Sequence, residues 1–196
     1  MKWLLIAIGG VVGLILFSVL TLALLGFRPS AGIVDSQIEI EQPPAVVWSW
    51  LTEDEKLKQW VSWLNEVHDL TPGREGTGAQ TRWIMIDPTM NDQRVEIYGE
   101  RTEWDPHRLS TMKLDSPGMF TGTATYRLID LDGGKTRVEY ESAFHMSHWA
   151  ARLFEPLVTP QARKKAEDDM ARLKTLAESP PTPPVQEHQL ELEAQR

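Results

Sequence analysis

The feature that most constrains this chain is an uncharged, strongly apolar run from Trp3 to Phe27, bounded by Lys2 and Arg28. A helix needs about 20 apolar residues to cross the hydrocarbon core of a bilayer, and this run is long enough to do so with some tilt. Trp3 and Phe27 would then lie near the two interfaces, where aromatic rings are favoured. The run therefore predicts a single-pass transmembrane anchor over residues 1–28, with the membrane crossed by residues 3–27.

A cleaved signal peptide is the alternative for the same segment. The apolar core of a signal peptide is usually about 7–15 residues and ends at a small-residue cleavage site. This run is longer, although residues 29–32, which we interpret as a short linker, supply small residues. Flanking positive charges set the direction of insertion, and here Lys2 opposes Arg28. The short N-terminal tail therefore predicts a signal anchor whose domain lies on the outer, periplasmic or extracytoplasmic side.

Charge and cysteine content exclude several classes of partner. The net charge is −8, and the 20 lysines and arginines are scattered along the chain, which argues against a nucleic-acid partner. The absence of cysteine excludes disulfides and thiolate metal sites, and we expect no metal and no cofactor. Residues 33–178 suffice for one domain, whereas the Pro-rich, polar residues 179–196 cannot form a core and are predicted to be disordered.

The start of the domain combines one strand with two short helices. Residues 33–41 alternate apolar and polar side chains, which is the pattern of a half-buried strand. Pro43-Pro44 end that strand and open a helix with apolar residues at three- and four-residue spacing. Thr52, followed three residues later by Glu55, predicts a capping box at the start of the second helix.

The rest of the domain is predicted to be an antiparallel meander followed by a long helix. Strands are predicted over residues 61–70, 79–86, 94–104, 108–114, 121–129 and 136–144. Residues 132–134, Asp-Gly-Gly, predict a tight hairpin, because glycine adopts positive φ at little cost. The final helix is predicted to begin with Thr159 as N-cap and Pro160 as its first residue, and to run to about Ala177.

This order of elements resembles the helix-grip, or START-like, fold of the polyketide cyclase/dehydrase and lipid-transport (SRPBCC) superfamily. The motifs that carry the resemblance are residues 43–48 (PPAVVW), Trp60 with Trp63, 72–78 (PGREGTG), 102–109 (TEWDPHRL), 133–138 (GGKTRV) and 169–174 (DMARLK). The resemblance covers residues 33–178 and implies an α+β fold. An antiparallel sheet would wrap around the long C-terminal helix, after the one transmembrane helix.

The resemblance also implies an apolar cavity between the sheet and that helix, suited to a lipid or another small hydrophobic molecule. We expect Thr136, Val138, Tyr140 and Phe144 to face inward on the last strand. If Thr102 and Trp104 face inward on the fourth strand, then Tyr98 and Glu100 of the same strand also face inward. The candidate cavity residues are Trp83, Met85, Tyr98, Glu100, Trp104, Tyr126 and Tyr140. Tryptophan and tyrosine at such positions are more often plain core than ligand contacts.

Glu100 is the candidate for catalysis, because a carboxylate in an apolar cavity could act as a general acid or base. A shift of one residue in the strand register would instead turn it to solvent. His145 and His148 are spaced as a metal pair would be on a helix, but no matched carboxylate follows, so no metal site is predicted. The chain has no nucleophile motif and no complete catalytic constellation.

Three functions remain open from the sequence. The leading interpretation is a membrane-anchored binding domain for a lipid or other small hydrophobic ligand. One alternative is a cyclase or dehydratase that uses Glu100 and a tyrosine as acid and base. The other is a non-catalytic scaffold whose Pro-rich segment, residues 180–184, recruits a partner as a polyproline II helix.

Overall fold

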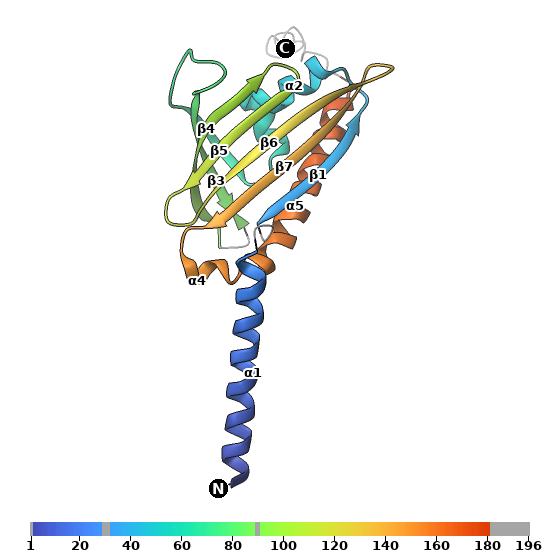
Figure 1. Cartoon of the computed structure of the whole chain (residues 1–196). Helices are drawn as coiled ribbons and strands as arrows, with labels where there is room; N and C mark the ends of the chain where they lie inside the picture. The colour runs from blue at the N-terminus through green and yellow to red at the C-terminus, as the bar shows by residue number, and fades with distance from the viewer. Residues whose placement is uncertain (1, 29–31, 89–90, 181–196) are drawn as a thin grey trace, which may run out of the picture.

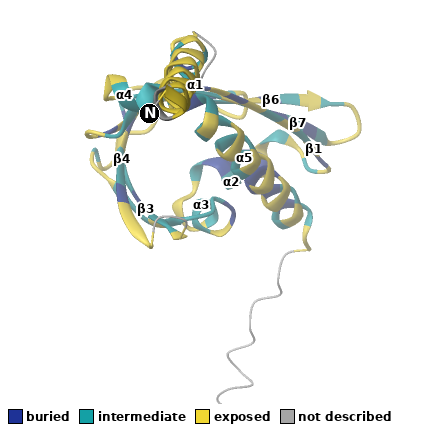
Figure 2. Cartoon of the chain, turned by 90° about the horizontal axis from the view of Figure 1, so that it is seen from below, coloured by how far each residue is buried: buried dark blue, intermediate teal, exposed yellow. Residues whose placement is uncertain are grey.

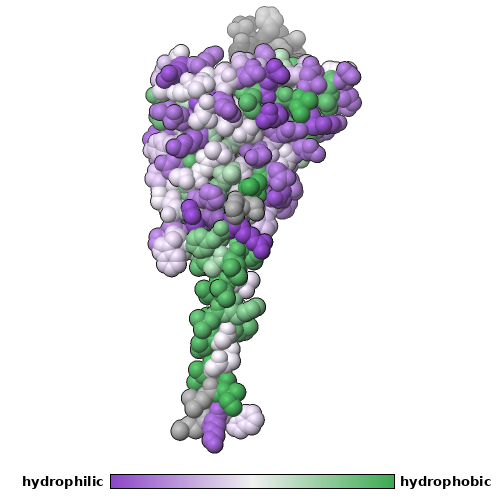
Figure 3. Space-filling model, in the orientation of Figure 1, coloured by the Kyte–Doolittle hydropathy of each residue, from purple (hydrophilic) through white to green (hydrophobic). Residues whose placement is uncertain are grey.

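The long N-terminal helix α1 (Lys2–Gly26) projects from a domain in which a curved sheet packs on helices (Figure 1). The computed structural model describes residues 2–28, 32–88 and 91–180. The surface of α1 is hydrophobic along most of its length (Figure 3), and Ile6–Gly26 is long and apolar enough to cross a membrane. Only its last residue, Gly26, is buried. The hydroxyls of Ser18 and Thr21 donate to carbonyls four residues earlier, at 2.9 Å, so no hydroxyl of the span is left unpaired.

The sheet is the predicted antiparallel meander, and its order confirms the topology. Its strands are β1 (Ile33–Ile40), β2 (Leu64–Asp69), β3 (Gln80–Asp87), β4 (Gln93–Asp105), β5 (Leu109–Ser116), β6 (Phe120–Leu131) and β7 (Lys135–Met146). They form one seven-stranded sheet in the order β1-β7-β6-β5-β4-β3-β2. The β6–β7 hairpin turns where predicted, with Gly133 and Gly134 at φ 86° and 77°. Antiparallel pairing of β1 with β7 brings the start of the domain beside its last strand.

The helices lie on the concave side of the sheet, as the helix-grip prediction requires. They are α2 (Pro44–Thr52), α3 (Asp54–Trp60) and α5 (Glu155–Glu178), and the short helix α4 (Trp149–Arg152) lies at the end of the sheet beside α1. Viewed along α1, the sheet curves around α2, α3 and α5 (Figure 2). The buried core joins α2, α3 and the C-terminal half of α5 to β1, β6 and β7, and consists of Ile40, Val47, Trp48, Leu51, Trp60, Leu128, Val138, Met170, Leu173 and Ala177. The densest packing therefore lies at the end of the sheet away from α1.

Helix α5 also protects the edge strand β1, whose outer backbone groups would otherwise be free to pair with another chain. Lys174 donates from Nζ to the Glu39 carbonyl at 2.6 Å. Arg163 donates from its guanidinium to the Asp35 carboxylate at 2.8 Å. These contacts hold α5 along the length of β1, which leaves the opposite side of the concave face to α3 and β2.

The predicted start of the last helix is wrong. Helix α5 begins at Glu155, contains Pro160 in its interior, and is preceded by the short helix α4, which the sequence did not predict. The Thr159 hydroxyl donates to the Glu155 carbonyl at 2.7 Å instead of capping a helix end. Pro156 explains the earlier start, because proline fits the first turn, where its missing N–H costs no hydrogen bond.

The predicted capping box is also wrong. Thr52 is the last residue of α2, and its hydroxyl donates to the Trp48 carbonyl at 2.9 Å. Helix α3 instead follows Glu53, which caps it without a side-chain hydrogen bond. Residues 29–31 of the predicted linker and residues 181–196 of the predicted disordered tail lie outside the described residues.

Candidate functional site

A β-bulge in β4 decides which residues of that strand face the helices. Trp104 pairs with Ser110 and Arg101 pairs with Met112, so the register against β5 shifts by one residue between Arg101 and Glu103. Thr102 is the extra residue. A bulge of this kind puts two residues of one strand opposite one residue of the next, which reverses the faces of all residues beyond it.

The prediction that Tyr98 and Glu100 face the cavity is therefore wrong. Glu100 is exposed and lies opposite Lys113 on the convex face. Tyr98 is 37% exposed, and its hydroxyl lies 3.2 Å from a Glu96 carboxylate oxygen. Gly99 between them faces inward, since a Cβ there would lie 2.7 Å from Met112 Cε. The candidate catalytic carboxylate is thus outside the grip.

Trp104, Tyr126 and Tyr140 face inward as expected, but they pack against the core. The rings of Trp104 and Trp48 are 4.7 Å apart between centroids, and those of Tyr126 and Tyr140 are 4.9 Å apart. Burial raises the pKa of the Tyr126 phenol well above its ordinary value, helped by Tyr140 and the Asp169 carboxylate. Burial likewise raises the pKa of the Tyr140 phenol. Their role as ligand contacts remains a prediction.

Trp83 and Met85 also face inward, in a less crowded part of the concave face. Trp83 pairs with Ile97, and Leu114 pairs with the inward-facing Gly99, so Trp83, Ile97 and Leu114 share one face of β3, β4 and β5. All of them, with Met85, are only half-buried. Figure 2 shows β3 and β4 on the side of the curved sheet opposite α5. Because they are half-buried, these apolar side chains remain partly accessible on the concave face.

Three hydrogen-bond donors lie along the same inner face of β3 and β4. Among the described residues, Thr81 Oγ1, Trp83 Nε1 and Arg101 Nε are buried without a hydrogen-bond partner. Thr81 is opposite Gly99, and the Arg101 N–H donates to the Ala79 carbonyl at 2.9 Å, so the donors are within a few residue steps of one another. A buried polar group left unpaired costs about 1–3 kcal/mol. Unpaired donors along an apolar face suit the acceptor groups of a ligand.

Arg101 is the residue of this site that the sequence reasoning missed. Its guanidinium lies 3.9 Å from the centroid of the Trp104 ring, a cation–π contact. Burial lowers the pKa of Arg101, and the carboxylates of Glu75, Asp54 and Asp69 oppose that effect. An arginine remains protonated at neutral pH, so Arg101 brings a positive charge beside an apolar surface, partly balanced by these three carboxylates. The bulge that turns Arg101 inward has no clear local motif in the sequence.

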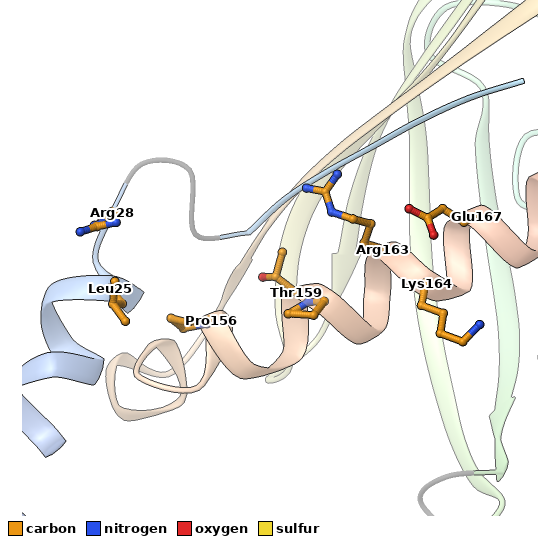
Figure 4. A pocket seen from close by; sticks show the side chains of 8 residues that line it. Leu25, Arg28, Pro156, Thr159, Arg163, Lys164 and Glu167 are labelled. Atoms are coloured by element: carbon orange, nitrogen blue, oxygen red, sulfur yellow. The ribbon is translucent and has the colours of Figure 1, made fainter.

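Two surface grooves lie outside the grip. The first, of about 490 Å³, runs between the end of α1 and the N-terminal half of α5 (Figure 4). It is lined by Leu25, Arg28, Pro156, Thr159, Pro160, Arg163, Lys164 and Glu167. The second, of about 520 Å³, crosses the convex face and is lined mainly by polar side chains. The first groove thus combines Arg28, at the end of α1, with Arg163, Lys164 and Glu167 of α5.

The histidine pair does not form a metal site with other residues that the structure describes. His148 accepts the Ala150 N–H through Nδ1 at 3.2 Å, at the start of α4. His145 Nδ1 lies 3.7 Å from a carboxylate oxygen of the buried Glu155. In residues 2–28, 32–88 and 91–180, no cluster of at least three His, Cys, Asp or Glu residues has the arrangement of a metal centre.

Comparison with known proteins agrees with the architecture just described. The family described as "Polyketide cyclase / dehydrase and lipid transport" matches residues 32–178. The chain belongs to this family. A comparison with curated protein sequences found no match. The family resemblance predicted from the motifs is thus confirmed over nearly the whole domain.

Solved structures similar to the domain include proteins from three bacteria. A conserved protein from Geobacillus kaustophilus has a TM-score of 0.62 at 12% identity, covering 74% of this chain and 94% of its own. A protein from Thermus thermophilus has a TM-score of 0.58 at 20% identity, with coverages of 74% and 96%. The Zhui aromatase/cyclase from a Streptomyces species has a TM-score of 0.59 at 18% identity, with coverages of 74% and 93%. At these identities the likeness establishes the fold alone.

Proposed function

We propose that this protein is a membrane-anchored binding protein for an apolar molecule that carries a hydrogen-bond acceptor, such as a fatty carboxylate or a lipid. The observation that carries the proposal is the cluster of unpaired donors, Thr81, Trp83 and Arg101, beside the half-buried apolar row of β3–β5. Ligand sites in proteins are mostly apolar, with a few polar groups that fix orientation. Family membership supports a ligand-binding domain.

The positive charge of Arg101 favours an anionic acceptor. A charge-assisted hydrogen bond contributes about 1.5–3 kcal/mol, more than a neutral one. The apolar side chains Met85, Ile97 and Leu114 would contact the hydrocarbon part of the same ligand. The outward position of Glu100 removes the carboxylate on which the cyclase or dehydratase alternative depended, so binding is the function that these residues favour.

Helix α1 supports the membrane part of the proposal. Ile6–Gly26 is exposed along its length up to its last turn and has the composition of a membrane span. A signal peptide would share these features, but it would be absent from the mature protein. The intact mass of the protein extracted from membranes separates the two cases: retention of residues 1–28 supports the anchor, and their loss refutes it.

Photo-crosslinking tests the binding site. Membranes that contain the full-length protein are incubated with a diazirine fatty acid and irradiated, and the labelled peptides are identified by mass spectrometry. We expect labels on the inner residues of β3–β5. Arg101→Met should weaken this labelling about tenfold, because it removes a charge-assisted hydrogen bond.

Glu100→Gln is the matched control, because Glu100 is the next residue of the same strand and points to the convex face. It should leave the labelling unchanged. Labels found only on α1, or equal labelling of wild type and Arg101→Met, would refute the proposed site.

A further inference from the structure

The first turns of the chain after β7 expose an unusual concentration of large apolar side chains. Trp149, Phe154 and Leu157 are 68%, 53% and 55% exposed, on α4 and the start of α5. Elsewhere in the described part of the domain, exposed large apolar residues are scattered: Ile33, Val46, Leu70 and Tyr98. Large apolar side chains exposed in one part of a protein surface mark an interaction site. We name Trp149, Phe154 and Leu157 the apolar foot.

The position of the apolar foot relative to α1 is fixed by close backbone contact. A Cβ on Gly26 would lie 2.2 Å from the Arg152 carbonyl oxygen, so the last turn of α1 touches α4 directly. A Cβ on Gly32 would lie 1.9 Å from the Phe144 carbonyl oxygen, so the chain after α1 is also held tightly against β7. Figure 1 shows α4 beside the upper end of α1. The apolar foot therefore lies at the level where α1 ends.

We infer that the apolar foot inserts into the membrane interface beside α1 and holds the domain against the bilayer. This inference rests on the proposed membrane anchoring. If Ile6–Gly26 crosses the hydrocarbon core, its C-terminal end lies at the headgroup level. Helix α4 touches that end, so the apolar foot lies at the same depth. Tryptophan and phenylalanine are favoured there, and interfacial elements bury apolar side chains roughly 5–10 Å deep.

The position of Arg28 fits a lipid surface as the occupant of the apolar foot. The groove between α1 and α5 is lined by three basic residues (Figure 4). Two of them are paired within the domain, Arg163 with the Asp35 carboxylate at 2.8 Å and Lys164 with Asp168 at 3.0 Å. Arg28 follows the end of α1, and an arginine next to apolar side chains matches the phosphates and the acyl region of phospholipids.

Contact with the bilayer would also bring the binding surface to the source of its ligand. On β4, Ile97 is the inward-facing residue next to Gly99, and Tyr98 between them pairs with Asp115 near the end of β5. Ser116, at the end of β5, pairs with Phe120 at the start of β6, and Phe120 pairs with Met146 at the end of β7, just before α4. The half-buried apolar row is thus at the end of the sheet nearest to α1. An apolar ligand could then move between the bilayer and the concave face without crossing bulk water.

The absence of cysteine from the chain allows a clean test. Single variants Trp149→Cys, Phe154→Cys and Leu157→Cys of the full-length protein are labelled with an environment-sensitive fluorophore and reconstituted into phosphatidylcholine vesicles. All three positions are exposed, so the labels do not disturb the core. Leu16→Cys, at an exposed site on α1, reports the hydrocarbon core, and Val46→Cys, on α2, is the distant control.

We expect the emission of the three apolar-foot labels to shift to the blue and to be quenched by lipids that carry a nitroxide near the headgroup. The Leu16→Cys label should be quenched by a nitroxide deep in the acyl chains, and the Val46→Cys label by neither. If Leu16→Cys is quenched and the apolar-foot labels are not, the inference is wrong and the anchoring stands. If Leu16→Cys is not quenched either, both are wrong.

Discussion

Asp169 should be the most sensitive position of the domain outside its apolar core. It is a 5% exposed carboxylate on α5 that accepts the Ser62 N–H at 3.0 Å and the Lys165 Nζ at 2.6 Å. The bond from Ser62 joins α5 to the segment between α3 and β2, whereas Lys165 lies on α5 itself. Asp169→Ala would leave the Ser62 N–H without its acceptor and Lys165 without its counter-charge, whereas Asp169→Asn would keep an oxygen for Ser62.

The structure gives the magnitude of each effect. Breaking a buried ion pair costs about 3–5 kcal/mol. The Lys165 side chain is 23% exposed and can be partly rehydrated, so we expect the free energy of unfolding to fall by about 3 kcal/mol for Asp169→Ala. Asp169→Asn should cost about half of that, because the bond to Ser62 is retained.

Asp168→Ala provides the matched control. Asp168 pairs with Lys164 at the same four-residue spacing on the same helix, but the two side chains are 61% and 75% exposed, so this loss should be about 0.3–0.5 kcal/mol. Denaturant unfolding of the full-length protein in detergent, followed by tryptophan fluorescence, measures all three variants. Equal destabilisation by Asp169→Ala and Asp168→Ala would refute the reasoning.

Two further predictions concern pH and backbone contact. Burial raises the pKa of Tyr126 and of Tyr140, so above about pH 10 the unfolded chain loses protons that the folded domain retains. The tyrosines should therefore not reduce the free energy of unfolding below about pH 10 and should reduce it above that pH. Denaturant midpoints measured against pH should show this fall, and replacing both tyrosines by phenylalanine should make it smaller. Gly32→Ala would place its Cβ 1.9 Å from the Phe144 carbonyl oxygen, so its melting temperature should drop, whereas Gly13→Ala, with nothing within 4 Å, should melt as wild type does.

Much of the fold could be predicted because its signals are local and repeated. Alternating side chains mark residues 33–41, and glycines with positive φ mark the turn at 132–134. An antiparallel meander then follows, since strands joined by short turns pair with their neighbours. The last two strands, predicted over 121–129 and 136–144, are longer at both ends, as Phe120–Leu131 and Lys135–Met146.

The site could not be predicted to the same degree, because it depends on one extra residue. The bulge at Thr102 leaves the pattern of β4 intact on either side, yet it exchanges the faces of Glu100 and Arg101. The helix starts failed for a related reason. Thr52 and Thr159 have side chains that could cap a helix. In the structure both residues lie inside helices, and their hydroxyls donate to carbonyls four residues earlier.

The side of the membrane on which the domain lies is the remaining prediction. Lys and Arg within about 15–20 residues of a span bias its direction, and the charges of a long domain count for little. Lys2 and Arg28 balance one another at the two ends of α1. We keep the expectation that the N-terminus lies inside and the domain on the outer side. Alkaline phosphatase fused after Gly32 should be active in bacterial cells, while an inactive fusion, together with a signal from a cytoplasmic reporter at the same site, would reverse the orientation.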